Sequence, residues 1–149
     1  MSLAHLLERQ ALAQPDAPAV FDGDRRHATY AEWAARSAAL AQRLRAAGLV
    51  PGDRVVLCLR NHPRYLELLW GAWWAGLAVV PVNAKLHPKE VAWIVGHAQA
   101  RWAFVSADVA PQPLDAIECQ VEVDSPEADA LLAAGPDRAL PPPVERAPD

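Results

Sequence analysis

The chain has 149 residues, of which 52% are hydrophobic, and a formal net charge of −4. That length fits one domain with a real hydrophobic core. Its basic residues are scattered singly or in short pairs, which argues against a nucleic-acid-binding protein. Cys58 and Cys119 lie inside apolar runs and have no metal-binding spacing. We therefore expect two structural thiols and a cytoplasmic protein.

The N-terminus shows no sign of a secretion signal. It has no basic segment followed by an unbroken apolar stretch, because Glu8 and Arg9 interrupt it. The most apolar window, residues 66–82, contains two glycines and ends near Pro81. It is too short and too broken for a bilayer, so we predict no membrane span.

The first third of the chain has the sequence pattern of a helix, a β-hairpin and a second helix. Apolar residues recur at helical spacing over residues 2–13, which indicates a surface helix. Residues 19–29 have the pattern of a small β-hairpin. Thr29 and Glu32 match a capping box, so a helix should start there and run to about Ala47. Gly48 can supply the left-handed end.

Residues 54–83 predict the centre of the fold. Residues 55–59 and 77–82 are continuous apolar runs rich in β-branched side chains, which are typical of buried strands. Residues 63–75 between them have helical length, with Pro63 suited to the first turn and Gly76 just past the last. Strand, helix and strand form the βαβ unit of a parallel sheet.

The helix predicted over residues 63–75 carries more large apolar side chains than one narrow face can hold. Trp70, Trp73 and Trp74 are the largest of them. We expect burial between layers or an interface, including a possible homodimer, rather than a ligand platform.

The second half of the chain continues the alternation of helix and strand. Pro88 predicts a helix start, with His87 as a possible cap and Glu90 three residues later. Residues 102–106 form a third apolar run, which predicts another buried strand. Residues 119–123 alternate as an edge strand does.

The end of the chain divides at about residue 135. A last helix is expected from Ser125 to Ala134. Residues 136–149 are rich in proline and charge, which predicts a linker or tail after an α/β domain over residues 1–135. The predicted fold is a three-layer α/β/α unit around a mostly parallel sheet, with a small hairpin near the N-terminus.

The residues themselves indicate no catalytic chemistry. Neither a glycine-rich phosphate loop nor a serine nucleophile elbow occurs. His62 and His87 precede prolines at helix starts, which favours capping over metal binding. For Asn61, Asn83 and Lys85 we expect structural roles. We therefore assign no catalytic, cofactor-binding or metal-binding residue.

The order of these segments nevertheless resembles the N-terminal part of the adenylate-forming (AMP-binding) enzymes. That family includes acyl-CoA synthetases, luciferase and peptide-synthetase adenylation domains. The resemblance covers about residues 3–125 and rests on the order and spacing of segments that are each weak alone. The matching segments are residues 15–20, 29–33, 40–44, 48–55, 59–63, 75–83 and 86–91.

The resemblance implies an enzyme that activates a carboxylate with ATP and Mg²⁺ to an acyl-adenylate and transfers the acyl group to coenzyme A. Medium- or long-chain fatty-acid-CoA ligases look like near relatives. In the family, the phosphate loop and the other catalytic motifs lie further along the chain than residue 149. The expectation is therefore an inactive N-terminal fragment whose partner is the remainder of the enzyme.

Two other functions stay open from the sequence. The chain could be a stand-alone interaction module that keeps the scaffold without the chemistry, with Trp70, Trp73 and Trp74 as its contact. It could also be a small nucleotide-binding protein of flavodoxin-like shape, which would bind ATP or AMP measurably. Fold alone does not choose among these functions.

Overall fold

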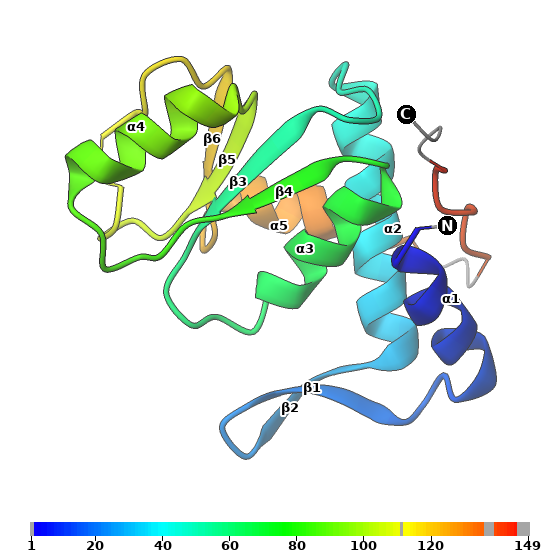
Figure 1. Cartoon of the computed structure of the whole chain (residues 1–149). Helices are drawn as coiled ribbons and strands as arrows, with labels where there is room; N and C mark the ends of the chain where they lie inside the picture. Colours follow the sequence, from blue (N-terminus) through cyan, green and yellow to red (C-terminus); the bar gives the residue numbers. More distant parts are fainter. Residues whose placement is uncertain (1, 111, 136–138, 146–149) are drawn as a thin grey trace.

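The computed structural model describes residues 2–110, 112–135 and 139–145. Helices and strands alternate through most of the chain (Figure 1). The elements are α1 (Ala4–Ala13), β1 (Pro18–Asp22), β2 (Arg25–Thr29), α2 (Tyr30–Ala46), β3 (Arg54–Cys58), α3 (Tyr65–Trp74), β4 (Ala78–Pro81), α4 (Pro88–Ala98), β5 (Trp102–Val105), β6 (Cys119–Glu122) and α5 (Pro126–Leu132).

A parallel sheet in the order β4-β3-β5-β6 forms the middle of the fold. In register, Val56 of β3 faces Val80 on one side and Ala103 on the other. β6 is an edge strand, as its alternating pattern predicts. β1 and β2 form a separate antiparallel hairpin, so the predicted fold class is confirmed.

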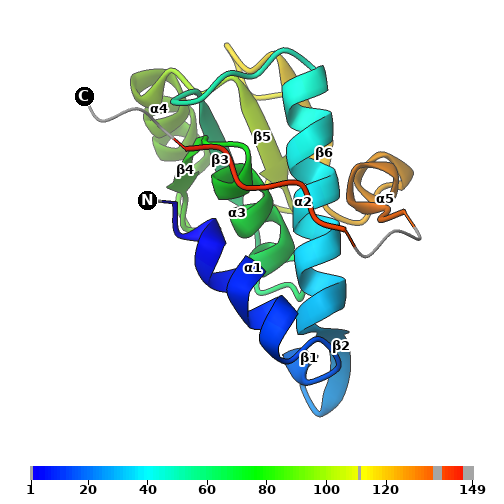
Figure 2. The same cartoon turned by 90° about the vertical axis from the view of Figure 1, so that its right-hand side faces the viewer.

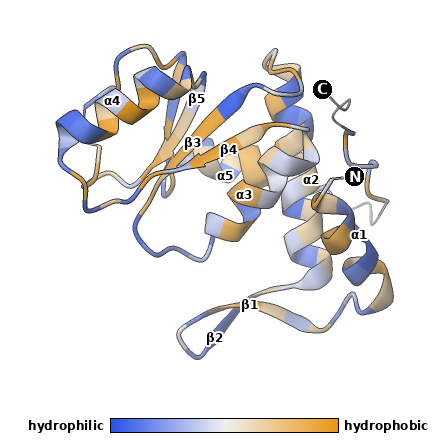
Figure 3. Cartoon of the chain, viewed as in Figure 1, coloured by the Kyte–Doolittle hydropathy of each residue, from blue (hydrophilic) through white to orange (hydrophobic). Residues whose placement is uncertain are grey.

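Helices cover both faces of the sheet, which gives three layers (Figures 1 and 2). α4 lies on one face, and α2 and α3 lie on the other with α1 and α5 beside them. Alternate strand residues point to opposite faces, so Val56 belongs to the α4 core and Leu57 to the α2–α3 core. The hydropathy colouring shows the apolar side of α4 turned toward the strands (Figure 3).

Local capping explains where two helices begin. At α2, Thr29 Oγ1 accepts from Glu32 N at 3.2 Å, and Glu32 accepts in return from Thr29 N at 2.8 Å. The backbone bond from Thr29 holds the pKa of Glu32 below its ordinary value. At α4, Glu90 Oε2 accepts from His87 N at 2.9 Å, and the His87 ring Nδ1 accepts from Lys89 N at 3.2 Å. The predicted capping box at Thr29 and the predicted cap at His87 are both confirmed.

Among the predicted helix boundaries that differ from the structure, two have a clear local cause. α3 begins at Tyr65 and not at Pro63, because a turn forms first in which Tyr65 N donates to His62 O at 3.0 Å. His62 Nδ1 accepts from Arg64 N at 3.1 Å in the same turn. α5 ends at Leu132, two residues before the predicted Ala134, because the backbone is already extended at the next position.

Candidate functional site

The carboxyl ends of β3 and β4 border a hollow at the sheet edge. It measures about 660 Å³. Parallel strands end at the same edge, so the loops after them meet there, and this edge is where open α/β sheets bind ligands. The hollow is lined by Leu59, Arg60, Asn61, Tyr65, Pro81, Val82, Asn83, Ala84 and Lys85.

The structure thus brings Asn61, Asn83 and Lys85 to one place, although they were expected to have only structural roles. Asn83 has such a role, because its Oδ1 accepts from Lys85 N at 2.9 Å and closes the loop after β4. Asn61 and Lys85 are both exposed. Burial raises the pKa of the Tyr65 phenol, which therefore stays protonated at neutral pH.

The loop after β3 is fixed from the other side by β5. Arg60 N donates to Ser106 Oγ at 3.0 Å, and Ser106 N donates to Cys58 O at 3.2 Å. The Arg60 guanidinium pairs with the Asp108 carboxylate. Arg60 thus lines the hollow with a guanidinium that is already paired with a carboxylate.

A second hollow, of about 470 Å³, lies between this loop and the hairpin. It reaches from Phe21 and Gly23 at the hairpin turn to His62 and Leu66. His62 Nε2 lies 3.0 Å from an Asp124 carboxylate oxygen, which ties the loop to the end of β6.

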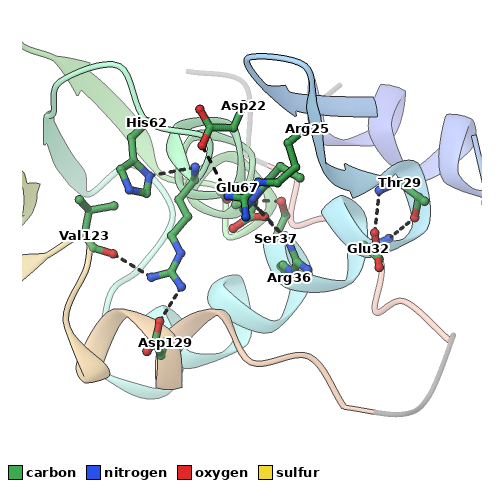
Figure 4. A network of polar contacts seen from close by, with 12 residues as sticks. Asp22, Arg25, Thr29, Glu32, Arg36, Ser37, His62, Glu67, Val123 and Asp129 are labelled. Carbon is green, nitrogen blue, oxygen red and sulfur yellow. Dashed lines mark hydrogen bonds and ion pairs between the residues drawn. The ribbon is translucent and has the colours of Figure 1, made fainter. Parts of the chain in front are cut away.

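Glu67 is the most deeply buried charged residue of the described chain, with 1% of its surface exposed. Arg36 Nη1 donates to its Oε1 at 2.7 Å (Figure 4). His27 Nε2 lies 2.8 Å from the same oxygen. Ser37 Oγ donates to the Glu67 carbonyl at 3.3 Å. A buried carboxylate needs such partners, so this cluster fastens the hairpin and α2 onto α3.

Sequence reasoning missed this cluster. Glu67 is the second residue of the apolar window 66–82. Its place at the start of that window gave no reason to expect it in the core. The signal that could have revealed it is a lone carboxylate within the apolar sequence of α3, because such a group must find a cation. The sequence did not identify which cation, since Arg36 lies 31 positions away.

The tryptophans of the predicted interface separate in the structure. Trp74 is 1% exposed, which places it in the core rather than on a contact face. Trp70 and Trp73 are half-buried and in edge-to-face contact, with ring centroids 4.9 Å apart. Trp70 also meets Trp33 edge-to-face at 4.9 Å. Trp70 and Trp73 thus extend the core aromatic cluster toward the surface.

The described residues offer few groups for chemistry. Burial raises the pKa of the Cys58 thiol, and burial with the nearby Glu127 carboxylate raises that of Cys119, so neither is an activated nucleophile. Across residues 2–110, 112–135 and 139–145, no three His, Cys, Asp or Glu side chains gather closely enough to hold a metal ion. Nor is any helix of this part long and apolar enough to cross a membrane.

Comparison with known proteins identifies the family. The profile of the family described as "AMP-binding enzyme" matches residues 7–149. The feruloyl-CoA synthase of an Amycolatopsis species is 47% identical over 83 residues, which is 56% of this chain and 17% of that protein. The sulfoacetate–CoA ligase of Cupriavidus necator is 32% identical over 157 positions, covering 99% of this chain and 31% of that protein. The chain thus spans less than a third of these relatives.

Solved structures agree with the sequence relatives. The crystal structure of the N-terminal domain of FACL13 from Mycobacterium tuberculosis superimposes with a TM-score of 0.83 at 28% identity. The match covers 100% of this chain and 40% of that one. A fatty acyl-CoA synthetase of the same organism matches with a TM-score of 0.79. The chain therefore belongs to the AMP-binding enzyme family, and its fold matches the N-terminal part of these solved structures.

Proposed function

We propose that this chain is part of an ATP-dependent acyl-CoA synthetase, with fatty acids as the first substrate class to test. Such an enzyme activates a carboxylate as an acyl-adenylate and passes the acyl group to coenzyme A. The observation that carries the proposal is the family match over residues 7–149, supported by relatives that are named CoA ligases and synthetases.

Within that enzyme, we assign the chain a scaffold role and expect it to be inactive alone. A nucleotide site needs backbone amides gathered at a strand-to-helix turn, and a magnesium site needs oxygen ligands. The turn after β3, residues 59–64, contains no glycine, and the described residues hold no acidic cluster that fits Mg²⁺. ATP, Mg²⁺ and coenzyme A would then be bound with residues outside this chain.

The test compares the 149-residue chain with the protein encoded by the whole open reading frame that contains it. ATP–pyrophosphate exchange is measured with short, medium and long fatty acids and an aromatic acid. We expect exchange from the whole protein with at least one acid and none from the 149-residue chain. A whole protein without exchange for any acid would contradict the ligase proposal, and exchange by the 149-residue chain would contradict its scaffold role.

The partner of this chain would then be the remainder of the enzyme, in the cytoplasm. If the reading frame ends at Asp149, the interaction module becomes the better proposal, with self-association as its simplest form. Trp70 and Trp73 would be the contact, so Trp73→Ala should shift a dimer to monomer in size-exclusion chromatography. If the unmodified chain and Trp73→Ala are both strict monomers, the proposed dimer is wrong.

A further inference from the structure

Residues 139–145, here called the strap, lie against the C-terminal end of α3 without helix or strand of their own. In Figure 2 the strap crosses α2 and α3. Within the described part of the chain, two main-chain groups of the strap form hydrogen bonds, and both bond to Trp74. Pro141 O accepts from Trp74 Nε1 at 2.8 Å, and Val144 N donates to Trp74 O at 2.8 Å. We propose that the strap detaches from Trp74 and returns to it as one cooperative unit, while the sheet stays folded.

Trp74 depends on the strap for the partners of its indole N–H and of its carbonyl. Its side chain is 1% exposed, and a buried indole N–H without an acceptor is unfavourable. Its carbonyl is one of the last four of α3, which have no partner within the helix. The preceding carbonyls are bonded locally, since Ala72 O accepts from Leu77 N and Trp73 O from Gly76 N. The Trp74 carbonyl receives its bond from the strap.

The strap also joins the N-terminus to this end of α3. His5 Nε2 of α1 lies 2.7 Å from Glu145 Oε1, and Ser2 Oγ donates to Trp73 O at 3.3 Å. The turn after α3 fits closely under the strap, because a Cβ added to Gly76 would lie 3.2 Å from Val144 Cγ1. Three distant parts of the sequence therefore meet at one point.

The strap has no secondary structure and is only partly buried, which is why it should open without the sheet. Pro143 is buried, but Pro142 is exposed and Val144 only half-buried. Segments with few buried contacts and no secondary structure open at a lower free energy than the core. The two Trp74 bonds lie at the two ends of the stretch 141–144, so both should break in the same opening event.

Hydrogen exchange by NMR on the 149-residue chain tests this proposal. We expect the Trp74 indole N–H and the Val144 amide to exchange at free energies of opening equal to each other and lower than those of β3 amides such as Val56. Both should be protected at least about tenfold, unlike the indole of Trp93, which is 67% exposed. Trp74 exchanging as freely as Trp93, or only together with β3, would overturn the proposal.

A matched pair of variants locates the cause. Val144→Pro removes the N–H that bonds Trp74 O, and Val144→Ala keeps it. We expect the proline variant to speed exchange of the Trp74 indole about tenfold relative to the alanine variant, with β3 amides unchanged. Glu145→Gln weakens the tie to His5 and should give a smaller increase. Loss of β3 protection in Val144→Pro, or no difference between the pair, would show that the strap is no independent unit.

Discussion

Gly71 is a residue at which α3 packs closely against α2. A Cβ placed there would lie 2.6 Å from Leu40 Cδ2 and 3.0 Å from Leu40 Cβ. Leu40 is fully buried, so it has little room to move. We expect Gly71→Ala to lower the free energy of unfolding by about 1–2 kcal/mol, because overpacking outweighs the gain in helix propensity. Urea unfolding followed by fluorescence measures this change.

Gly96 provides the control for Gly71. It lies in α4, is exposed, and would have nothing within 4 Å of an added Cβ. Gly96→Ala should therefore raise the free energy of unfolding by about 0.5–1 kcal/mol through helix propensity alone. Equal effects of the two substitutions would mean that the contact with Leu40 does not constrain the packing of α2 and α3.

Glu67 gives the second prediction at this scale. Replacing it with alanine leaves Arg36 and His27 near a buried site without their carboxylate. We expect Glu67→Ala to lower the free energy of unfolding by about 3 kcal/mol, the lower end for a buried pair, because Arg36 is still 29% exposed. Glu122→Ala, at an exposed position, should change it by less than about 0.5 kcal/mol. Thermal unfolding that does not distinguish the two would contradict this account.

At the scale of elements, α1 and the strap are joined by a contact that depends on pH. Glu8 and Glu145 both face His5, and their hydrogen bonds raise the pKa of His5 above 6.5, with Glu8 the larger cause. His5 lowers the pKa of Glu145 in return. Because the His5 pKa is raised on folding, its stabilising contribution is complete below 6.5 and is lost as the pH rises through the raised value.

An NMR titration of the His5 ring checks this expectation. The midpoint should lie above 6.5 in the native chain and move down in Glu145→Gln, while Glu8 keeps it from returning fully to the ordinary value. Protection of the Trp74 indole should fall over the same pH range as His5 loses its proton. A His5 midpoint that Glu145→Gln leaves unchanged would show that α1 and the strap are not coupled through this pair.

The elements were predictable where their cause is local. Thr29 and Glu32 lie three positions apart, so the start of α2 follows from the sequence alone. The start of α3 was misplaced because the preceding turn uses the His62 ring as an acceptor, which a proline rule does not anticipate. The contacts of the strap join residues 67 and 70 positions apart, and only the assembled fold brings them together.

At the scale of the whole molecule, the parallel sheet and its layers follow from the apolar runs and the helices between them. The candidate site is harder to predict, because its residues are brought together by loops. Asn61 and Asn83 become neighbours only when β3 and β4 align at the same edge, and Glu67 becomes notable only when α2 covers it. These contacts depend on how the strands and helices pack, which residue types and their spacing do not reveal.

The strand order β4-β3-β5-β6 also affects how the chain is made on the ribosome. β3 is synthesised before both of its neighbours and can pair first with β4. Its other edge stays unpaired until β5, Trp102–Val105, has been synthesised. During that interval four of the five β3 residues, which are buried in the finished fold, belong to a strand with an open edge. Open apolar edges promote aggregation, so we expect nascent chains halted between β4 and β5 to be the form that most needs a chaperone.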